Sequence, residues 1–304
     1  MQRVTLFLFG ILVLLAAGPA HAENPFNTSE RMVQIESRPG IQIRTIIYRP
    51  ERPSATVVLF PDGNGRLDIT HVFNDPSWGR SEDIPLELMG HLLDQGLIVV
   101  LMDAPTDHRS MLGVNGWHGP NIFRLSKDHA RDIDAVIDYL NARESLPVWL
   151  VGIRMGAFSA ATAAIQLQEK VNGLVIAGGI TQCPEQKILL QLCPQGLMGM
   201  PLHEITVPTL ILSGGHAFPE ALLASALNHS PSIRFHTFPE FVDFESWGSW
   251  DATANTIPGV SNADISREMT DFIRWNQINN PVIVSETLPK AIPDVEIYLV
   301  GCCY

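Results

Sequence analysis

Short apolar runs of strand length alternate with helical patterns along most of the chain. The runs are almost continuously hydrophobic, which is typical of strands that are buried on both faces of a parallel sheet. The segment 129–143 shows helical spacing instead, because Ile133, Val136, Ile137 and Leu140 recur on one stripe. This alternation predicts an α/β fold with a doubly wound, mostly parallel sheet and helices on both faces. The expected strands are 41–48, 55–60, 97–102, 148–151, 173–176, 208–212 and 233–238, and the expected helices are 85–94, 129–143, 157–168, 220–228 and 265–275.

A turn bracketed by two glycines follows the expected strand at 148–151. It reads Gly152-Ile153-Arg154-Met155-Gly156 and leads into a helix of small residues. Glycines two positions before and two after a central residue let a strained strand-to-helix turn pass close to its neighbours, as in a nucleophile elbow. The central position of this turn is Arg154.

The flanking pattern resembles the α/β-hydrolase family, and in particular bacterial secreted members with the run Val-Trp-Leu-Val-Gly before the elbow. The resemblance covers roughly residues 50–276 and implies the α/β-hydrolase fold, with hydrolysis of acyl esters by a serine, a histidine and a carboxylate. The segment 57–65 is similar to the family's oxyanion loop. The runs that carry the resemblance are 57–65, 99–105, 148–161 and 207–212.

Three positions depart from the family pattern. Arg154 stands where the family has its serine, and a guanidinium is neither a nucleophile nor deprotonated near neutral pH. The family's acid follows the strand that is here 208–212, but no carboxylate occurs there before Glu220. The family's histidine precedes the last helix, where the best-matching stretch is 257–260, without histidine. The resemblance therefore supports the fold, and we assign no catalytic residue; whether the chain is an enzyme stays open.

An arginine at this position needs a negative partner, because the N-terminus of the following helix already disfavours positive charge. The favoured interpretation is an internal acid that seals the site, from Asp62, Asp103 or the segment 240–245. The alternative is a small anionic ligand, a carboxylate or phosphate, held by Arg154, the N–H of Met155 and the loop of Asp62, Gly63 and Asn64. An acidic side chain within bonding distance of Arg154 would indicate a sealed site.

The first 22 residues have the pattern of a signal peptide. Arg3 precedes an apolar run over 4–17, and Ala20-His21-Ala22 fits a cleavage site before Glu23. We therefore expect a periplasmic or secreted protein with a hydrolase-fold domain over 23–276 and a proline-broken tail over 277–304. After cleavage no apolar stretch is long enough to cross a membrane.

Charge and residue spacing exclude several partners. Loss of Arg3 takes the formal net charge from −12 to −13, which opposes binding to nucleic acid. We expect no cofactor, and no metal, because neither a Cys-x-x-Cys pair nor a His-x-x-x-His helix face occurs. The cluster Asp128, His129, Asp132 and Asp134 is explained by a solvated helix face. The oligomeric state cannot be inferred.

The chain has four cysteines, and in the oxidising compartment that a signal peptide implies, disulfides can form. Cys183 and Cys193 are ten apart and can form a disulfide, whereas the adjacent Cys302 and Cys303 bridge each other only with strain. Three hypotheses follow: a degenerate hydrolase-fold protein that binds a small molecule or a partner, an ester hydrolase with a relocated nucleophile, and an interaction protein that uses its terminal cysteines. His108 lies after the strand at 97–102, where it is either a cleft residue or, more simply, a solvated loop residue.

Overall fold

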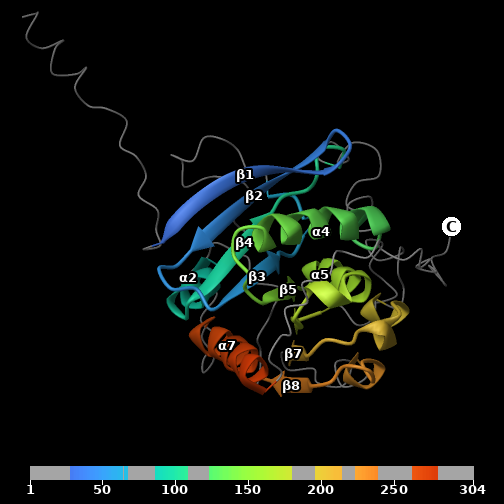
Figure 1. Ribbon diagram of the computed structural model, residues 1–304. Coiled ribbons are helices and arrows are strands. Elements are labelled where there is room, and N and C mark those ends of the chain that lie inside the picture. Colours follow the sequence, from blue (N-terminus) through green and yellow to red (C-terminus); the bar gives the residue numbers. More distant parts are fainter. Residues whose placement is uncertain are drawn as a thin grey trace, which may run out of the picture.

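The computed structural model describes residues 28–63, 65–67, 86–108, 123–179, 196–213, 223–238 and 262–279. The strands among these residues form one sheet in the order β1-β2-β4-β3-β5-β6-β7-β8 (Figure 1). β1 and β2 are antiparallel to each other, β2 is antiparallel to β4, and all other neighbours are parallel. The strands are β1 Ser29–Arg38, β2 Ile41–Arg49, β3 Ala55–Phe60, β4 Leu97–Met102, β5 Val148–Ile153, β6 Gly173–Ala177, β7 Thr209–Ser213 and β8 Ile233–Thr237.

Helices cover both faces of the sheet. α4 and α5 pack together on one face, and α2 and α7 pack together on the other (Figure 1). The doubly wound, mostly parallel α/β architecture expected from the alternation is confirmed. The helices are α2 Leu86–Asp94, α4 Lys127–Asn141, α5 Gly156–Gln166 and α7 Asn262–Asn279, with short 3-10 turns at Gln168–Lys170, Gly196–Gly199 and Leu202–Glu204.

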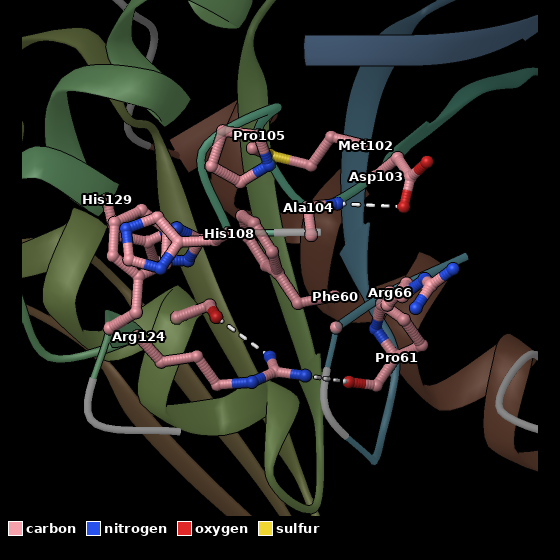
Figure 2. A pocket seen from close by; sticks show the side chains of 13 residues that line it. Phe60, Pro61, Arg66, Met102, Asp103, Ala104, Pro105, His108, Arg124 and His129 are labelled. Carbon is pink, nitrogen blue, oxygen red and sulfur yellow. Dashed lines mark hydrogen bonds between the residues drawn. The ribbon is translucent and has the colours of Figure 1, made fainter. Parts of the chain in front are cut away.

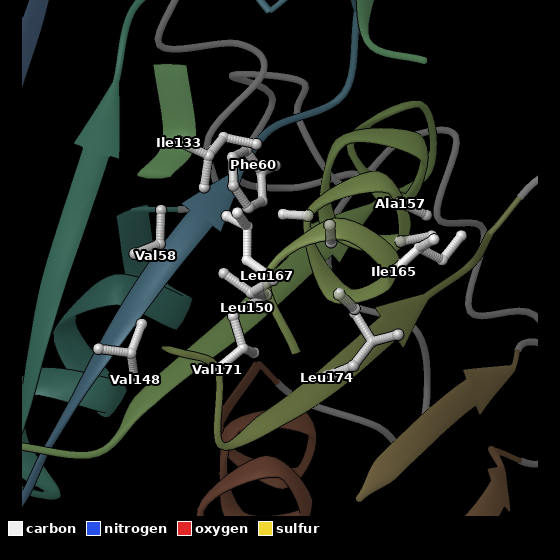
Figure 3. Close-up of a cluster of buried hydrophobic side chains, with 14 of the residues drawn as sticks. Val58, Phe60, Ile133, Val148, Leu150, Ala157, Ile165, Leu167, Val171 and Leu174 are labelled. Atoms are coloured by element: carbon white, nitrogen blue, oxygen red, sulfur yellow. The ribbon is translucent and has the colours of Figure 1, made fainter. Parts of the chain in front are cut away.

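The sheet separates two hydrophobic clusters. Side chains of β3, β5 and β6, among them Val58, Leu150 and Leu174, pack under α4 and α5 (Figure 3). The alternate side chains of the same strands pack against α2 and α7. β3, β4 and β5 are buried along their whole lengths, which is why they read as unbroken apolar runs. This rigid centre fixes the carboxyl ends of β3, β4 and β5, where the candidate site lies.

One strand was not expected. β1 pairs with β2 at the edge of the sheet, through a turn in which Gly40 adopts a φ of +74°. Its sequence is mostly polar and exposed, so it has no apolar run to mark it. The other expected strands are confirmed within one or two residues, and α7 extends further at both ends than the expected helix 265–275.

The solvated helix face expected for Asp128, His129, Asp132 and Asp134 is wrong for two of these residues. Asp132 is fully buried and His129 is 7% exposed. β1 packs across α4 and brings Arg38 to Asp132, with Nε 2.9 Å from Oδ1, whereas His129 packs against Phe60 and Phe123. Asp134 is partly buried and pairs with Lys170, and Asp128 is exposed.

No helix within the described ranges is both long and apolar enough to span a membrane. α7 is the longest of them, but charged side chains recur along it. The expected signal peptide, residues 1–22, lies outside the described part of the chain.

Candidate functional site

The turn after β5 has the backbone of an elbow. β5 ends at Ile153 and α5 begins at Gly156, so only two residues separate strand from helix. Arg154 adopts a φ of +48°, and within the described residues no other non-glycine has a positive φ. A left-handed conformation costs a residue with a side chain roughly 1–2 kcal/mol. The sharp, strained turn predicted from the two glycines is therefore present, and Arg154 occupies its apex.

Both glycines are required by close backbone contacts. A Cβ on Gly152 would stand 2.5 Å from the Cα of Ala157, and a Cβ on Gly156 would stand 2.0 Å from the carbonyl oxygen of Phe60. Such distances cannot be relieved by a side-chain rotation, since the opposing atoms are backbone. The start of α5 is thus pressed against the end of β3, which brings the loop after β3 to the elbow.

Asp62, in that loop, meets the elbow with both carboxylate oxygens. Oδ2 lies 3.0 Å from the guanidinium of Arg154, and Oδ1 accepts a hydrogen bond of 3.1 Å from the N–H of Met155. The two charged side chains are each about one-fifth exposed. Asp62 is therefore an internal acid that meets Arg154, as one of the alternatives expected; the segment 240–245, another of them, lies outside the described residues. The same carboxylate accepts the hydrogen bond of a backbone N–H, that of Met155, at the start of α5.

Asp103 was another candidate for that role and lies elsewhere. Its carboxylate is buried, and Oδ1 accepts hydrogen bonds from the N–H groups of Leu67 and Ala104, at 2.8 and 2.9 Å. Oδ2 faces Arg44 at 3.9 Å. Asp103 thereby fixes the turn that leaves β4.

A buried arginine that the sequence did not suggest holds the loop after β3. Arg124, just before α4, is 3% exposed and donates to Ser159 Oγ of α5 at 2.8 Å (Figure 2). Its other terminal nitrogen donates to the carbonyl oxygens of Pro61, Asp62 and Gly63 at 3.1, 3.4 and 3.3 Å. No local pattern distinguishes this arginine from a surface one. The role of Arg124 depends on contacts between α4, α5 and the loop after β3, which only the fold brings together.

A pocket lies between this loop, the end of β4 and the start of α4 (Figure 2). Its empty volume is about 530 Å³, counted out to the solvent at its mouth. Arg154 does not line it. The pocket is lined by Phe60, Pro61, Gly65, Arg66, Met102, Asp103, Ala104, Pro105, His108, Phe123, Arg124, His129 and Ser159.

Two histidines belong to the pocket wall. His108 stacks on Phe123, with ring centroids 3.6 Å apart, and His129 meets the same phenylalanine edge-on at 5.0 Å. Burial, and then the nearby charges of Arg124, His108 and Arg38, lower the pKa of His129 to about 3. Burial likewise lowers the pKa of His108, against the opposing effect of Asp107. His129 is consequently a neutral imidazole at physiological pH. The interpretation of His108 as a solvated loop residue is wrong, since it lines the pocket.

The remaining candidates are only partly placed. The structure brings together Asp62, Gly63, Arg154 and Met155, whereas Asn64, Cys183 and Cys193 lie outside the described residues. The same is true of the expected acid position after Ser213 and of the stretch 257–260. Among the residues the structure covers, no group of three or more His, Cys, Asp and Glu side chains could hold a metal ion.

Sheet order and elbow together define the class: this chain has the α/β-hydrolase fold. Solved structures with this fold resemble it over most of its length. Dienelactone hydrolase from Anabaena variabilis ATCC 29413 is 17% identical, with a TM-score of 0.57 over 82% of this chain and 98% of that one. A thermostable carboxyl esterase from Bacillus coagulans is 11% identical, with a TM-score of 0.52 over 82% and 99%. A lidless serine hydrolase from Xanthomonas campestris is 14% identical, with a TM-score of 0.50 over 83% and 97%.

The sequence itself gives no closer relationship. No protein-family model matches the chain, and no curated protein matches it. At 11–17% identity the structural likeness shows the fold alone. The function must therefore be argued from the site.

Proposed function

We propose that this chain is a degenerate α/β-hydrolase-fold protein that does not cleave esters and instead binds a small molecule or a partner at the carboxyl end of its sheet. The observation that carries this proposal is the Asp62 carboxylate, which contacts both Arg154 and the N–H of Met155. In this fold the residue at the elbow apex is the nucleophile, and the N–H of the next residue helps to stabilise the oxyanion. Here the apex residue forms an ion pair with Asp62, and the next N–H donates a hydrogen bond to the same carboxylate.

The chemistry of each position supports the proposal. Arg154 cannot attack a carbonyl carbon, because its guanidinium stays protonated and has no lone pair to offer. A developing oxyanion would have to displace a carboxylate that already accepts the Met155 N–H, and two negative charges cannot share that donor. Even with binding energy retained, loss of a triad lowers turnover by several powers of ten.

The alternative of a relocated nucleophile gains no support from Ser159, the serine that lines the pocket. Its hydroxyl is buried and accepts a hydrogen bond from the Arg124 guanidinium. A nucleophilic serine also donates its proton to a base, and among the described residues the Ser159 hydroxyl donates to none. Ser246, Ser249 and Cys183 also carry a hydroxyl or a thiol in segments that follow strands of the sheet, but they lie outside the described residues.

The proposal also includes export from the cytoplasm and pairing of the cysteines. Residues 1–22 support a periplasmic or secreted location, and N-terminal sequencing of protein from the cell envelope would then begin at Glu23. A Cys183–Cys193 disulfide is compatible with that location. A role for Cys302 and Cys303 in joining chains would appear as a disulfide-linked species in non-reducing electrophoresis.

The test of the proposal is turnover of p-nitrophenyl acetate and butyrate by the purified mature chain. We expect release of p-nitrophenol at the rate of the buffer alone, with or without a serine-directed organophosphate. Turnover above background that the organophosphate abolishes would overturn the proposal, because it would reveal an active serine.

A further inference from the structure

The pocket between β3, β4 and α4 is separate from the sealed elbow. It opens on the β4 side of the loop after β3, and Arg154 is not part of its lining. Arg124 contributes to both features, because it lines the pocket and holds the loop that carries Asp62. Because Arg154 does not line the pocket, a ligand bound there would not occupy the position of the Asp62–Arg154 pair.

The pocket wall is largely apolar and aromatic. Phe60 and Phe123 present rings to it, Met102 and Pro105 continue the apolar surface, and His108 lies flat on Phe123. Aromatic rings favour stacked or edge-on contact with a flat apolar group.

The polar group that a ligand would satisfy is His129. It is 7% exposed, and neither ring nitrogen has a hydrogen-bond partner among the described residues. A buried donor or acceptor that lacks a hydrogen-bond partner destabilises the folded chain. Packed between Phe60 and Phe123, the imidazole is held edge-on to both rings without being hydrogen-bonded by them. This is the situation in which a ligand group that forms the missing bond gains affinity.

The charges around the pocket favour an anion. Arg66 and Arg124 both line it, and the charge of Arg124 also acts on the His129 imidazole. Asp103 is the acid in the lining, but its carboxylate accepts two backbone N–H groups and faces Arg44. Since the whole chain is acidic, an anionic ligand needs such a local positive region.

We propose that this pocket binds a small organic acid with a flat apolar body, whose ring packs against Phe123 and whose carboxylate lies near Arg124 and accepts the N–H of His129. This inference rests on the proposed function and gives its unspecified ligand a site and a chemical class. The ligand differs in position from the anion first considered for Arg154.

The test uses benzoate as the probe, because it is a flat ring bearing one carboxylate. Benzamide has the same shape without the charge, and acetate has the charge without the ring. Calorimetric titration of the full mature chain should give a dissociation constant for benzoate at least tenfold lower than that for either control. The signals of the His129 imidazole should move on titration with benzoate in NMR spectra of 15N-histidine-labelled protein. Equal binding of benzamide, or no saturable benzoate binding, would overturn the proposal.

Two variants locate the site. His129→Phe keeps a ring at this position but removes the N–H, and it should weaken benzoate binding at least tenfold. His203→Phe changes an exposed histidine remote from the pocket lining and should leave binding unchanged. Unaltered benzoate affinity in a folded His129→Phe variant contradicts the proposal. If that variant does not fold, the wild-type NMR titration decides, and benzoate shifts that omit His129 contradict the proposal equally.

The two proposals fail separately. A chain that cleaves p-nitrophenyl esters and binds benzoate loses the proposed function and keeps this site. A chain that is inert toward esters and does not bind benzoate keeps its degenerate elbow and loses this site.

Discussion

The Asp62 carboxylate lies 3.0 Å from the guanidinium of Arg154, at the apex of a turn whose backbone is that of a catalytic elbow. The strain of the turn is retained, with Arg154 at a φ of +48°, although the side chain at its apex cannot perform nucleophilic chemistry. The elbow now joins the loop after β3 to α5 by an ion pair.

The Asp62–Arg154 pair should be measurable as a coupling energy. Each partner is about one-fifth exposed, so solvent screens the pair only in part. We expect about 1–2 kcal/mol of coupling in a double-mutant cycle of Asp62→Asn and Arg154→Met, measured by urea unfolding. A coupling energy indistinguishable from zero would mean that the contact does not hold the loop.

The two glycine environments predict different costs for the same substitution. Gly156→Ala places a Cβ 2.0 Å from a backbone oxygen of β3 and should destabilise the chain by about 3 kcal/mol or more. Gly40→Ala meets no atom within 4 Å and should cost about 1 kcal/mol from its positive φ alone. The two variants are compared by measuring the free energy of unfolding of each. Equal costs would contradict the close approach of α5 to β3.

Burial of His129 predicts a loss of stability in acid. The unfolded state takes up a proton near pH 6.5, but the folded state does so only near the lowered pKa of about 3. Protons therefore favour unfolding below pH 6.5, and the contribution is lost progressively down to pH 3. Between pH 7 and pH 5 the loss should be about 2 kcal/mol. His129→Phe removes this titration. Between pH 7 and pH 5 the unfolding free energy of this variant should therefore fall by about 2 kcal/mol less than that of the wild type. An identical fall in both proteins would refute the buried neutral imidazole.

The buried ion pair between β1 and α4 should be far more sensitive than an exposed one. Asp132 is fully buried, and burial raises its pKa although hydrogen bonds from Arg38 and Ser37 act to lower it. Arg38→Met leaves the carboxylate without its cation and should cost about 3–5 kcal/mol. The matched control Arg131→Met breaks the exposed pair with Asp128 and should cost less than about 1 kcal/mol. Similar costs would contradict the packing of β1 on α4.

Restoring a serine should not restore an enzyme. Arg154→Ser supplies the hydroxyl but neither the acid nor the histidine of the family pattern. Its turnover of p-nitrophenyl acetate should therefore stay within about tenfold of the buffer rate, because a triad acts as a unit. Rate enhancement of several powers of ten would show that a base stands beside the elbow.

The sequence was sufficient for the sheet because β3, β4 and β5 are buried on both faces and must be continuously apolar. The elbow was equally predictable, since only glycine fits at Gly152 and Gly156. β1 was missed because an edge strand exposed to solvent carries no apolar signal.

The neighbours of the elbow were harder to predict. Asp62 could be predicted as one of several candidate acids for Arg154, because the loop after β3 must approach the elbow in this architecture. The roles of Arg124 and His129 could not be foreseen, since each depends on what α4 meets across the fold. Asp132 looks solvated until β1 is known to cover it, and His129 looks solvated until its contacts with Phe60 and Phe123 are known.

The proposed lack of an activated serine is tested most directly by intact-mass spectrometry of the wild-type mature chain after incubation with a fluorophosphonate probe. An activated serine forms a covalent adduct with this reagent, whereas a guanidinium and the hydrogen-bonded hydroxyl of Ser159 should not. We expect the mass of the chain to be unchanged after prolonged incubation. A stoichiometric adduct, mapped by peptide sequencing to any serine, would contradict it.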